Sequence, residues 1–142
     1  MNVSQIVTRP LIAIAAGRTV LDAAKLMLEK NIGLLVIIHG QDSTKVVGVI
    51  SERDIIRTIA SGRTLSMPVD DVCTKRVVTV YGNSDVAEAA KAMNKNRIRH
   101  VVVVDDKGKP IGVVSMRDLV GERATLTAIL QSNEKEIFHG GD

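Results

Sequence analysis

The residues best suited to chemistry occur twice in this chain, in the same order and spacing. Gly48–Asp54 reads Gly-Val-Ile-Ser-Glu-Arg-Asp, and Gly112–Asp118 reads Gly-Val-Val-Ser-Met-Arg-Asp. If a helix begins at each serine, its free N–H groups and positive dipole end favour a phosphate. The neighbouring arginine adds a cation, and the aspartate can accept hydrogen bonds from two sugar hydroxyls. Each set is therefore suited to binding a ribose phosphate.

A purely structural interpretation of the same residues also has to be considered. Ser51 and Ser115 can be N-caps, with Asp54 and Asp118 reaching back as in a capping box. The glycine that begins each motif leaves room for a close approach, either by a ligand or by a neighbouring backbone. The motif by itself leaves both alternatives open.

The elements that must position these residues are repeated as well. Val20–Met27 (Val-Leu-Asp-Ala-Ala-Lys-Leu-Met) returns as Val86–Met93 (Val-Ala-Glu-Ala-Ala-Lys-Ala-Met), with apolar residues at helical spacing. We expect strands at 11–15, 33–38 and 46–50 with helices at 19–30 and 51–60. In the second copy we expect strands at 77–80, 98–104 and 111–114, and helices that begin near 84 and 115, with 121–130 also helical. A three-stranded sheet cannot bury its apolar face alone, so the two sheets should pack together.

Composition narrows the class of protein. Of 142 residues 45% are hydrophobic, with one Tyr, one Phe and no Trp, so the core must be aliphatic. The net charge of +3 is too small to indicate nucleic-acid binding. Cys73 is the one cysteine and permits no internal disulfide. We find no signal pattern and no apolar run of about 18 residues, and therefore expect a cytoplasmic protein without a membrane segment.

No residue set predicts catalysis. The chain has no supported Ser-His-Asp arrangement and no Gly-rich phosphate loop of the Walker type. The histidines His39, His100 and His139 lack the spacing of metal ligands. We expect a protein that is not an enzyme, holds no metal and requires no cofactor.

The repeated motif and the repeated Ala-Ala-x-x-Met helices resemble a tandem pair of CBS domains, also called a Bateman module. The resemblance implies an α+β fold in which two β-α-β-β-α repeats pack through their sheets with pseudo-two-fold symmetry. We expect repeat 1 at residues 1–65, repeat 2 at 66–130, and a polar C-terminal tail at 131–142.

The resemblance also implies a ligand and its site. CBS pairs bind adenosine-containing ligands in clefts between the repeats, here AMP, ADP or ATP as a regulatory ligand. The aspartates corresponding to the family's ribose-binding residue are Asp54 and Asp118. Four further motif residues would contact ribose or phosphate: Ser51, Arg53, Ser115 and Arg117. The adenine slot would be lined by Val49, Val113, Leu11, Ile12, Val77 and Val78.

The two clefts should differ. Arg99 and His100 stand where relatives often place phosphate-binding residues, whereas repeat 1 has Gly33 and Leu34 there. We therefore expect the cleft served by Arg99 and His100 to favour ligands with more phosphate.

The function implied is that of a stand-alone sensor of adenine nucleotides, acting as a homodimer and regulating an unidentified enzyme or transporter. One alternative is a structural dimerisation module whose motif is only a cap. Another is a module for S-adenosylmethionine. We do not expect nucleic-acid binding, because the chain lacks stacking aromatics and a basic helix face.

Overall fold

The structure is a computed structural model that describes residues 1–7 and 10–131, without the side chains of 122–129. Each half contains three strands and two helices in the order β-α-β-β-α, preceded by a 3-10 turn. The first half comprises η1 (Val3–Gln5), β1 (Ala13–Ala15), α1 (Val20–Lys30), β2 (Leu34–Ile38), β3 (Val46–Ser51) and α2 (Glu52–Ala60). The second comprises η2 (Val69–Asp71), β4 (Thr79–Tyr81), α3 (Val86–Asn96), β5 (His100–Val104), β6 (Pro110–Ser115) and α4 (Met116–Gln131). Nearly all of the predicted tail lies outside the described residues.

The two sheets have the same topology and register. In the first sheet β1 runs parallel to β2 and β2 antiparallel to β3, and β4, β5 and β6 repeat this arrangement. A register shift follows Ile37 in one sheet and Val103 in the other. The predicted fold class is therefore confirmed, and the two sheets also share the position of a register shift.

The first strand of each repeat begins later than predicted. We expected strands from Leu11 and from Val77, but β1 begins at Ala13 and β4 at Thr79. Leu11 and Val77 instead pack in the apolar cluster between the two sheets. These two apolar side chains are therefore partly buried between the sheets, although their residues precede the paired strands.

The helices lie close to the predicted ranges, except at the C-terminal end of the described chain. The predicted helices at 115 and 121–130 form the single element α4, but Gly121 interrupts it with φ 67° and ψ 157°. This backbone conformation is open to glycine and strained for other residues. Among the described residues, no helix has the length and apolar character needed to cross a membrane.

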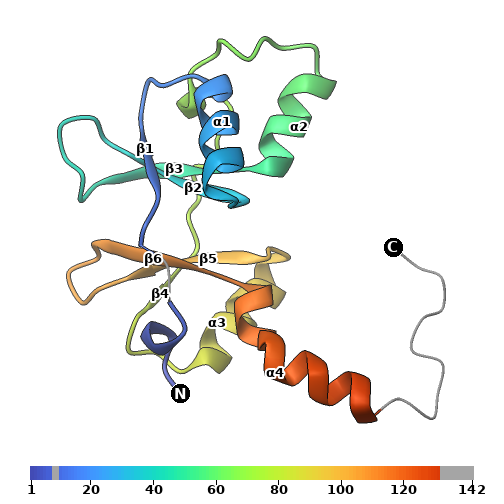
Figure 1. Cartoon of the computed structure of the whole chain (residues 1–142). Helices are drawn as coiled ribbons and strands as arrows, with labels where there is room; N and C mark the ends of the chain where they lie inside the picture. The colour runs from blue at the N-terminus through green and yellow to red at the C-terminus, as the bar shows by residue number, and fades with distance from the viewer. Residues whose placement is uncertain (8–9, 132–142) are drawn as a thin grey trace.

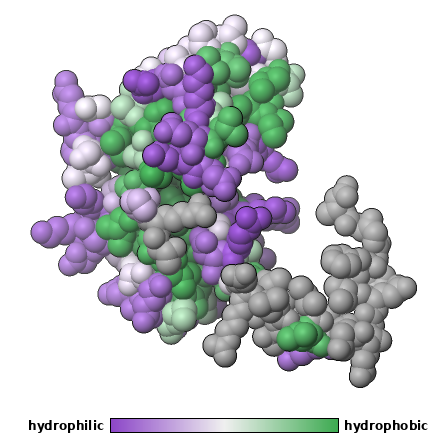
Figure 2. Space-filling model, in the orientation of Figure 1, coloured by the Kyte–Doolittle hydropathy of each residue, from purple (hydrophilic) through white to green (hydrophobic). Residues whose placement is uncertain are grey.

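The interior is divided into three aliphatic clusters. One cluster lies inside each repeat, and the third joins the sheets through Val36, Val102 and Val104. Figure 1 shows the two sheets facing each other, with α1 and α2 outside the first sheet and α3 and α4 outside the second. Figure 2 shows hydrophobic residues at the surface near α2, where Ile56 is 65% exposed and Ile59 is 59% exposed.

The two repeats exchange their N-terminal turns. Val3 in η1 is fully buried in the core of the second repeat, and Val69 in η2 is fully buried in the core of the first. Val3 N donates to Ser84 O at 2.8 Å, and Val69 N donates to Arg18 O at 2.8 Å. Figure 1 shows η1 beside the second sheet, on the far side of the molecule from α1. Each repeat is thus completed by a segment that precedes the other repeat in sequence.

Candidate functional site

Both motifs form complete capping boxes at the start of a helix. In repeat 1, Ser51 Oγ accepts from Asp54 N at 3.3 Å and Asp54 Oδ2 accepts from Ser51 N at 2.9 Å. In repeat 2, Ser115 Oγ accepts from Asp118 N at 3.2 Å and Asp118 Oδ2 accepts from Ser115 N at 2.8 Å. The capping interpretation of the serine and the aspartate is therefore confirmed in both repeats.

The capping hydrogen bond uses one of the two carboxylate oxygens of Asp54 and of Asp118. In each repeat the backbone N–H of the serine bonds to Oδ2, which leaves Oδ1 of Asp54 or Asp118 for another donor. In the described part of the chain no side chain donates to Asp118 Oδ1, and Asp118 is exposed. A carboxylate in this position can cap its helix and still accept a hydrogen bond from a ligand hydroxyl.

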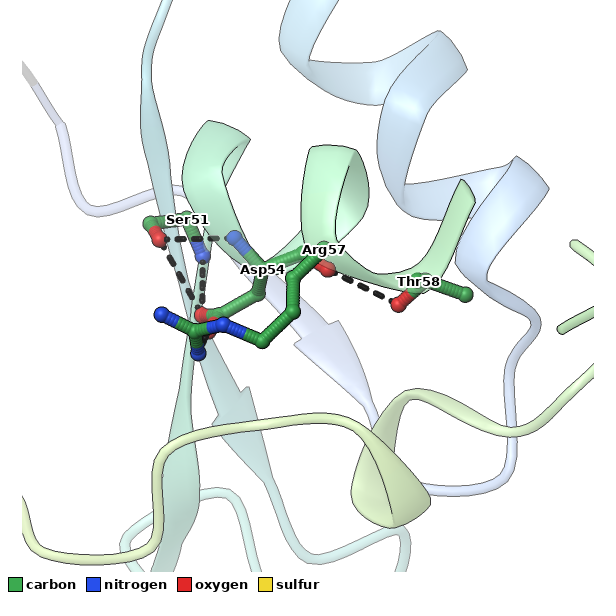
Figure 3. A network of polar contacts seen from close by, with 4 residues as sticks. All are labelled: Ser51, Asp54, Arg57 and Thr58. Carbon is green, nitrogen blue, oxygen red and sulfur yellow. Dashed lines mark hydrogen bonds and ion pairs between the residues drawn. The ribbon is translucent and has the colours of Figure 1, made fainter. Parts of the chain in front are cut away.

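Asp54 differs from Asp118 because it has a second partner. Arg57 Nη1 lies 3.4 Å from Asp54 Oδ1, and only 5% of the Asp54 side chain is exposed. Ser51 Oγ also donates to Asp54 Oδ2 at 3.1 Å, and Thr58 Oγ1 donates to Asp54 O at 2.8 Å (Figure 3). Sequence reasoning missed Arg57, although its position three residues after Asp54 places the two on one face of a helix.

The motif glycines make room for the other half of the chain. A Cβ on Gly48 would lie 2.7 Å from Thr74 O and 2.9 Å from Cys73 Sγ. Next to it, Val49 and Thr74 exchange two backbone hydrogen bonds of 2.9 Å. A Cβ on Gly112 would collide with Val7. Of the two alternatives for this glycine, the structure shows close approach by a neighbouring chain segment.

The apolar residues predicted to line the adenine slot separate into two groups. Four of them, Leu11, Val49, Val77 and Val113, lie in the cluster between the sheets. Ile12 packs instead against the core of repeat 1, and Val78 against the core of repeat 2. The structure therefore brings four of the six to the boundary between the repeats.

The repeated architecture matches a known family. The family model for the CBS domain matches residues 3–61 and 69–124, one copy on each repeat. The chain belongs to the CBS domain family. Its two copies form a CBS pair, as the resemblance of the sequence implied.

Similar proteins include uncharacterised and ligand-bound members. An uncharacterised 17.7 kDa protein of Acidianus ambivalens is 41% identical over 118 residues, covering 83% of this chain and 70% of that protein. A Pyrobaculum aerophilum CBS domain protein complexed with AMP is 33% identical, with a TM-score of 0.84 over 92% of this chain and 99% of that one. The CBS domain pair of protein MJ0100, solved with 5′-methylthioadenosine and S-adenosyl-L-methionine, is 28% identical with a TM-score of 0.76, over 84% and 96% of the two chains.

The basic residues of the CBS pair lie at its surface. Arg53 and Arg117 are exposed in the first turns of α2 and α4, and Arg99 is exposed just before β5. Arg99 O accepts from Met116 N at 2.8 Å, which places the backbone of Arg99 beside the start of α4. The described structure thus places two cations of repeat 2 near the capping box of Asp118.

The pKa of His100 is influenced by charged residues of both repeats. Desolvation lowers the pKa of this half-buried imidazole, whereas the carboxylates of Asp118 and Glu52 act in the opposite direction and Arg99 lowers it further. Glu52 begins α2 and Asp118 lies in the first turn of α4. Carboxylates at the starts of both motif helices are therefore close enough to His100 to raise its pKa, against the larger effect of desolvation.

A groove lies apart from the two capping boxes. A groove of about 350 Å³ lies between β4 and α3, with Tyr81, Lys91 and Lys95 among its lining residues. It contains none of the predicted ligand-binding residues, so it is separate from the capping boxes. Among the described residues no group of three His, Cys, Asp or Glu side chains could hold a metal ion.

Proposed function

We propose that this CBS pair is a regulatory module that binds an adenine nucleotide between its repeats and performs no catalysis. The observation that carries this proposal is the second oxygen of the Asp118 carboxylate. Asp118 is exposed at a helix start, its Oδ1 is not used by the cap, and it belongs to a motif whose Val113 lies in the cluster between the sheets. The AMP-bound and S-adenosylmethionine-bound relatives support an adenosyl ligand.

Each motif residue has a role in this proposal. Asp54 and Asp118 accept hydrogen bonds from the ribose hydroxyls, and Ser51 and Ser115 hold these carboxylates in place. Arg53, Arg117, Arg99 and His100 attract phosphate, and the apolar residues between the sheets contact the adenine. Because Ile12 and Val78 point into the separate cores, they contribute less to this slot than Leu11 and Val77.

Charge favours a nucleotide over S-adenosylmethionine. The two proposed sites together include the exposed Arg53, Arg99 and Arg117, and their aspartates are already used in caps. S-adenosylmethionine carries a sulfonium cation, which these arginines repel, whereas a phosphate is attracted to them. We therefore expect AMP, ADP and ATP to bind more tightly than S-adenosylmethionine.

Calorimetric titration of AMP, ADP, ATP and S-adenosylmethionine tests the proposal. Asp118→Ala should weaken nucleotide binding by at least about tenfold, because it removes hydrogen bonds to a charged acceptor. Asp54→Ala tests the other cleft in the same way. Folded wild-type protein that binds none of these ligands would contradict the proposal and favour the alternative of a dimerisation module in which the capping boxes are only structural.

We also propose that the protein is a homodimer that pairs through exposed apolar helix faces. Leu28 on α1 is 85% exposed, and Ile56 and Ile59 on α2 are more than half exposed. Clustered exposed hydrophobic side chains mark interaction sites. Ile56→Glu should shift the molar mass measured by light scattering from dimer to monomer, whereas Thr44→Glu in an exposed loop should not. The regulated enzyme or transporter and the cytoplasmic location stay predictions.

A further inference from the structure

We propose that Arg57 is an internal competitor for the ligand, which closes the ribose-binding carboxylate of repeat 1 and leaves that of repeat 2 open. The inference rests on the proposed nucleotide-binding function and deepens it, because it assigns a cause for unequal clefts. It starts from the one charged contact that distinguishes the two capping boxes among the described residues, the 3.4 Å ion pair between Arg57 Nη1 and Asp54 Oδ1.

The pair occupies the one carboxylate oxygen that the cap leaves over. Asp54 Oδ2 already accepts from Ser51 N and Ser51 Oγ, so Oδ1 is the acceptor that remains for a ribose hydroxyl. Figure 3 shows the Arg57 side chain folded back along α2 toward this carboxylate. The guanidinium therefore competes with a ligand hydroxyl for Oδ1.

Movement of the guanidinium is feasible because, within the described part of the chain, the Arg57 side chain has a single polar contact. Its side chain is 68% exposed, and its one described side-chain hydrogen bond is to Asp54. Solvent around the exposed guanidinium screens its attraction to Asp54, so a ligand can displace the arginine at a modest loss of affinity. Arg57 therefore reduces binding in repeat 1 without abolishing it.

The second repeat serves as an internal comparison. The residue three positions after Asp118 is Gly121, which has no side chain to reach the carboxylate. Asp118 is exposed, whereas Asp54 is 5% exposed. Among the described residues, the two motifs have the same capping box but differ in whether Oδ1 of the aspartate has a side-chain partner. The difference lies at the third residue after the aspartate, which is Arg57 in repeat 1 and Gly121 in repeat 2.

The experiment measures the repeat 1 site alone, in protein carrying Asp118→Ala. Adenosine and AMP are each titrated by calorimetry into Asp118→Ala and into Asp118→Ala with Arg57→Gln. We expect the second protein to bind both ligands about two- to fivefold more tightly, since the effect acts through the ribose and the arginine of the competing pair is screened by solvent. Raising the KCl concentration should tighten adenosine binding only while Arg57 is present, because salt screens the competing pair.

Arg53→Gln in the Asp118→Ala background is the matched control. It removes the same charge from the same helix, but Arg53 is proposed to attract phosphate. AMP binding should therefore weaken while adenosine binding stays unchanged, the opposite pattern to Arg57→Gln. Thermal unfolding of every variant shows that the comparison is made on folded protein.

The possible failures are distinguishable. If Arg57→Gln weakens AMP and leaves adenosine unchanged, Arg57 is a phosphate-binding residue and the competitor role is overturned. The same holds if wild-type protein binds AMP but Arg57→Gln does not improve the repeat 1 site. If wild-type protein binds neither adenosine nor AMP, the proposed function itself fails, and the competitor role fails with it.

Discussion

At the scale of single residues, the motif glycines are required by packing between the halves of the chain. Gly48→Ala should lower the free energy of unfolding by about 1–3 kcal/mol, because its Cβ would press on the Thr74 carbonyl, which cannot move without breaking its pairing with Val49. Urea denaturation measures the change. Gly40→Ala is the control, since nothing lies within 4 Å of a Cβ there. Unchanged stability of Gly48→Ala, together with lost nucleotide binding, would instead assign the glycine to the ligand.

His100 should make stability depend on pH. Desolvation lowers its pKa below the ordinary value of 6.5, so the folded protein binds the proton less readily than the unfolded chain. The stability contributed by neutral His100 is full above about pH 6.5 and is lost as pH falls through the lowered pKa. Urea midpoints at about pH 7.5 and pH 5.5 should therefore differ more for wild type than for His100→Asn. Equal differences for the two proteins would contradict this prediction.

At the scale of elements, the ends of α1 and α3 use the same backbone conformation with different residues. Asn31 and Arg97 are the C-caps, with φ of 53° and 54°. Asparagine tolerates this left-handed conformation, whereas arginine is strained in it. Arg97→Gly should raise the free energy of unfolding by about 0.5–1 kcal/mol.

Lys95→Gly is the matched control for Arg97→Gly. It places glycine inside the last turn of α3, where the backbone is helical, and should lower stability by up to about 1 kcal/mol. Thermal or urea unfolding measures the change in the free energy of unfolding for both variants. A loss of stability in Arg97→Gly would show that the arginine side chain contributes more than its backbone strain costs.

The elements were predictable to different degrees. The helices α1 and α3 begin where expected, because Thr19 and Asp85 cap them through contacts within a few residues. The starts of β1 and β4 were wrong by two residues. A strand begins where its neighbour begins to pair with it, and Ala13 and Thr79 are the first residues with such partners. That information lies in another part of the chain.

At the scale of the whole molecule, the exchanged turns make the two repeats one cooperative unit. Val3→Ala and Val69→Ala should each cost about 1–3 kcal/mol, because each side chain is fully buried. Each substitution removes apolar contacts from the core of the other repeat, so both should lower a single unfolding midpoint in calorimetry. Two separate transitions, with only one of them shifted, would show that the repeats unfold independently.

The duplication, the element order and the aliphatic core could be read from the sequence alone, and the capping box was one of two interpretations that it allowed for each motif. These features depend on residue types and on spacings within one helix or one turn, where the physics is local. The structure was needed to show that Gly48 lies against Thr74, that Val3 and Val69 each pack in the core of the other repeat, and that Leu11 lies between the sheets while Ile12 does not. It also decided that Arg57 reaches Asp54. Each of these depends on how separate segments approach one another or on the conformation that one side chain adopts, and residue spacing leaves both undetermined.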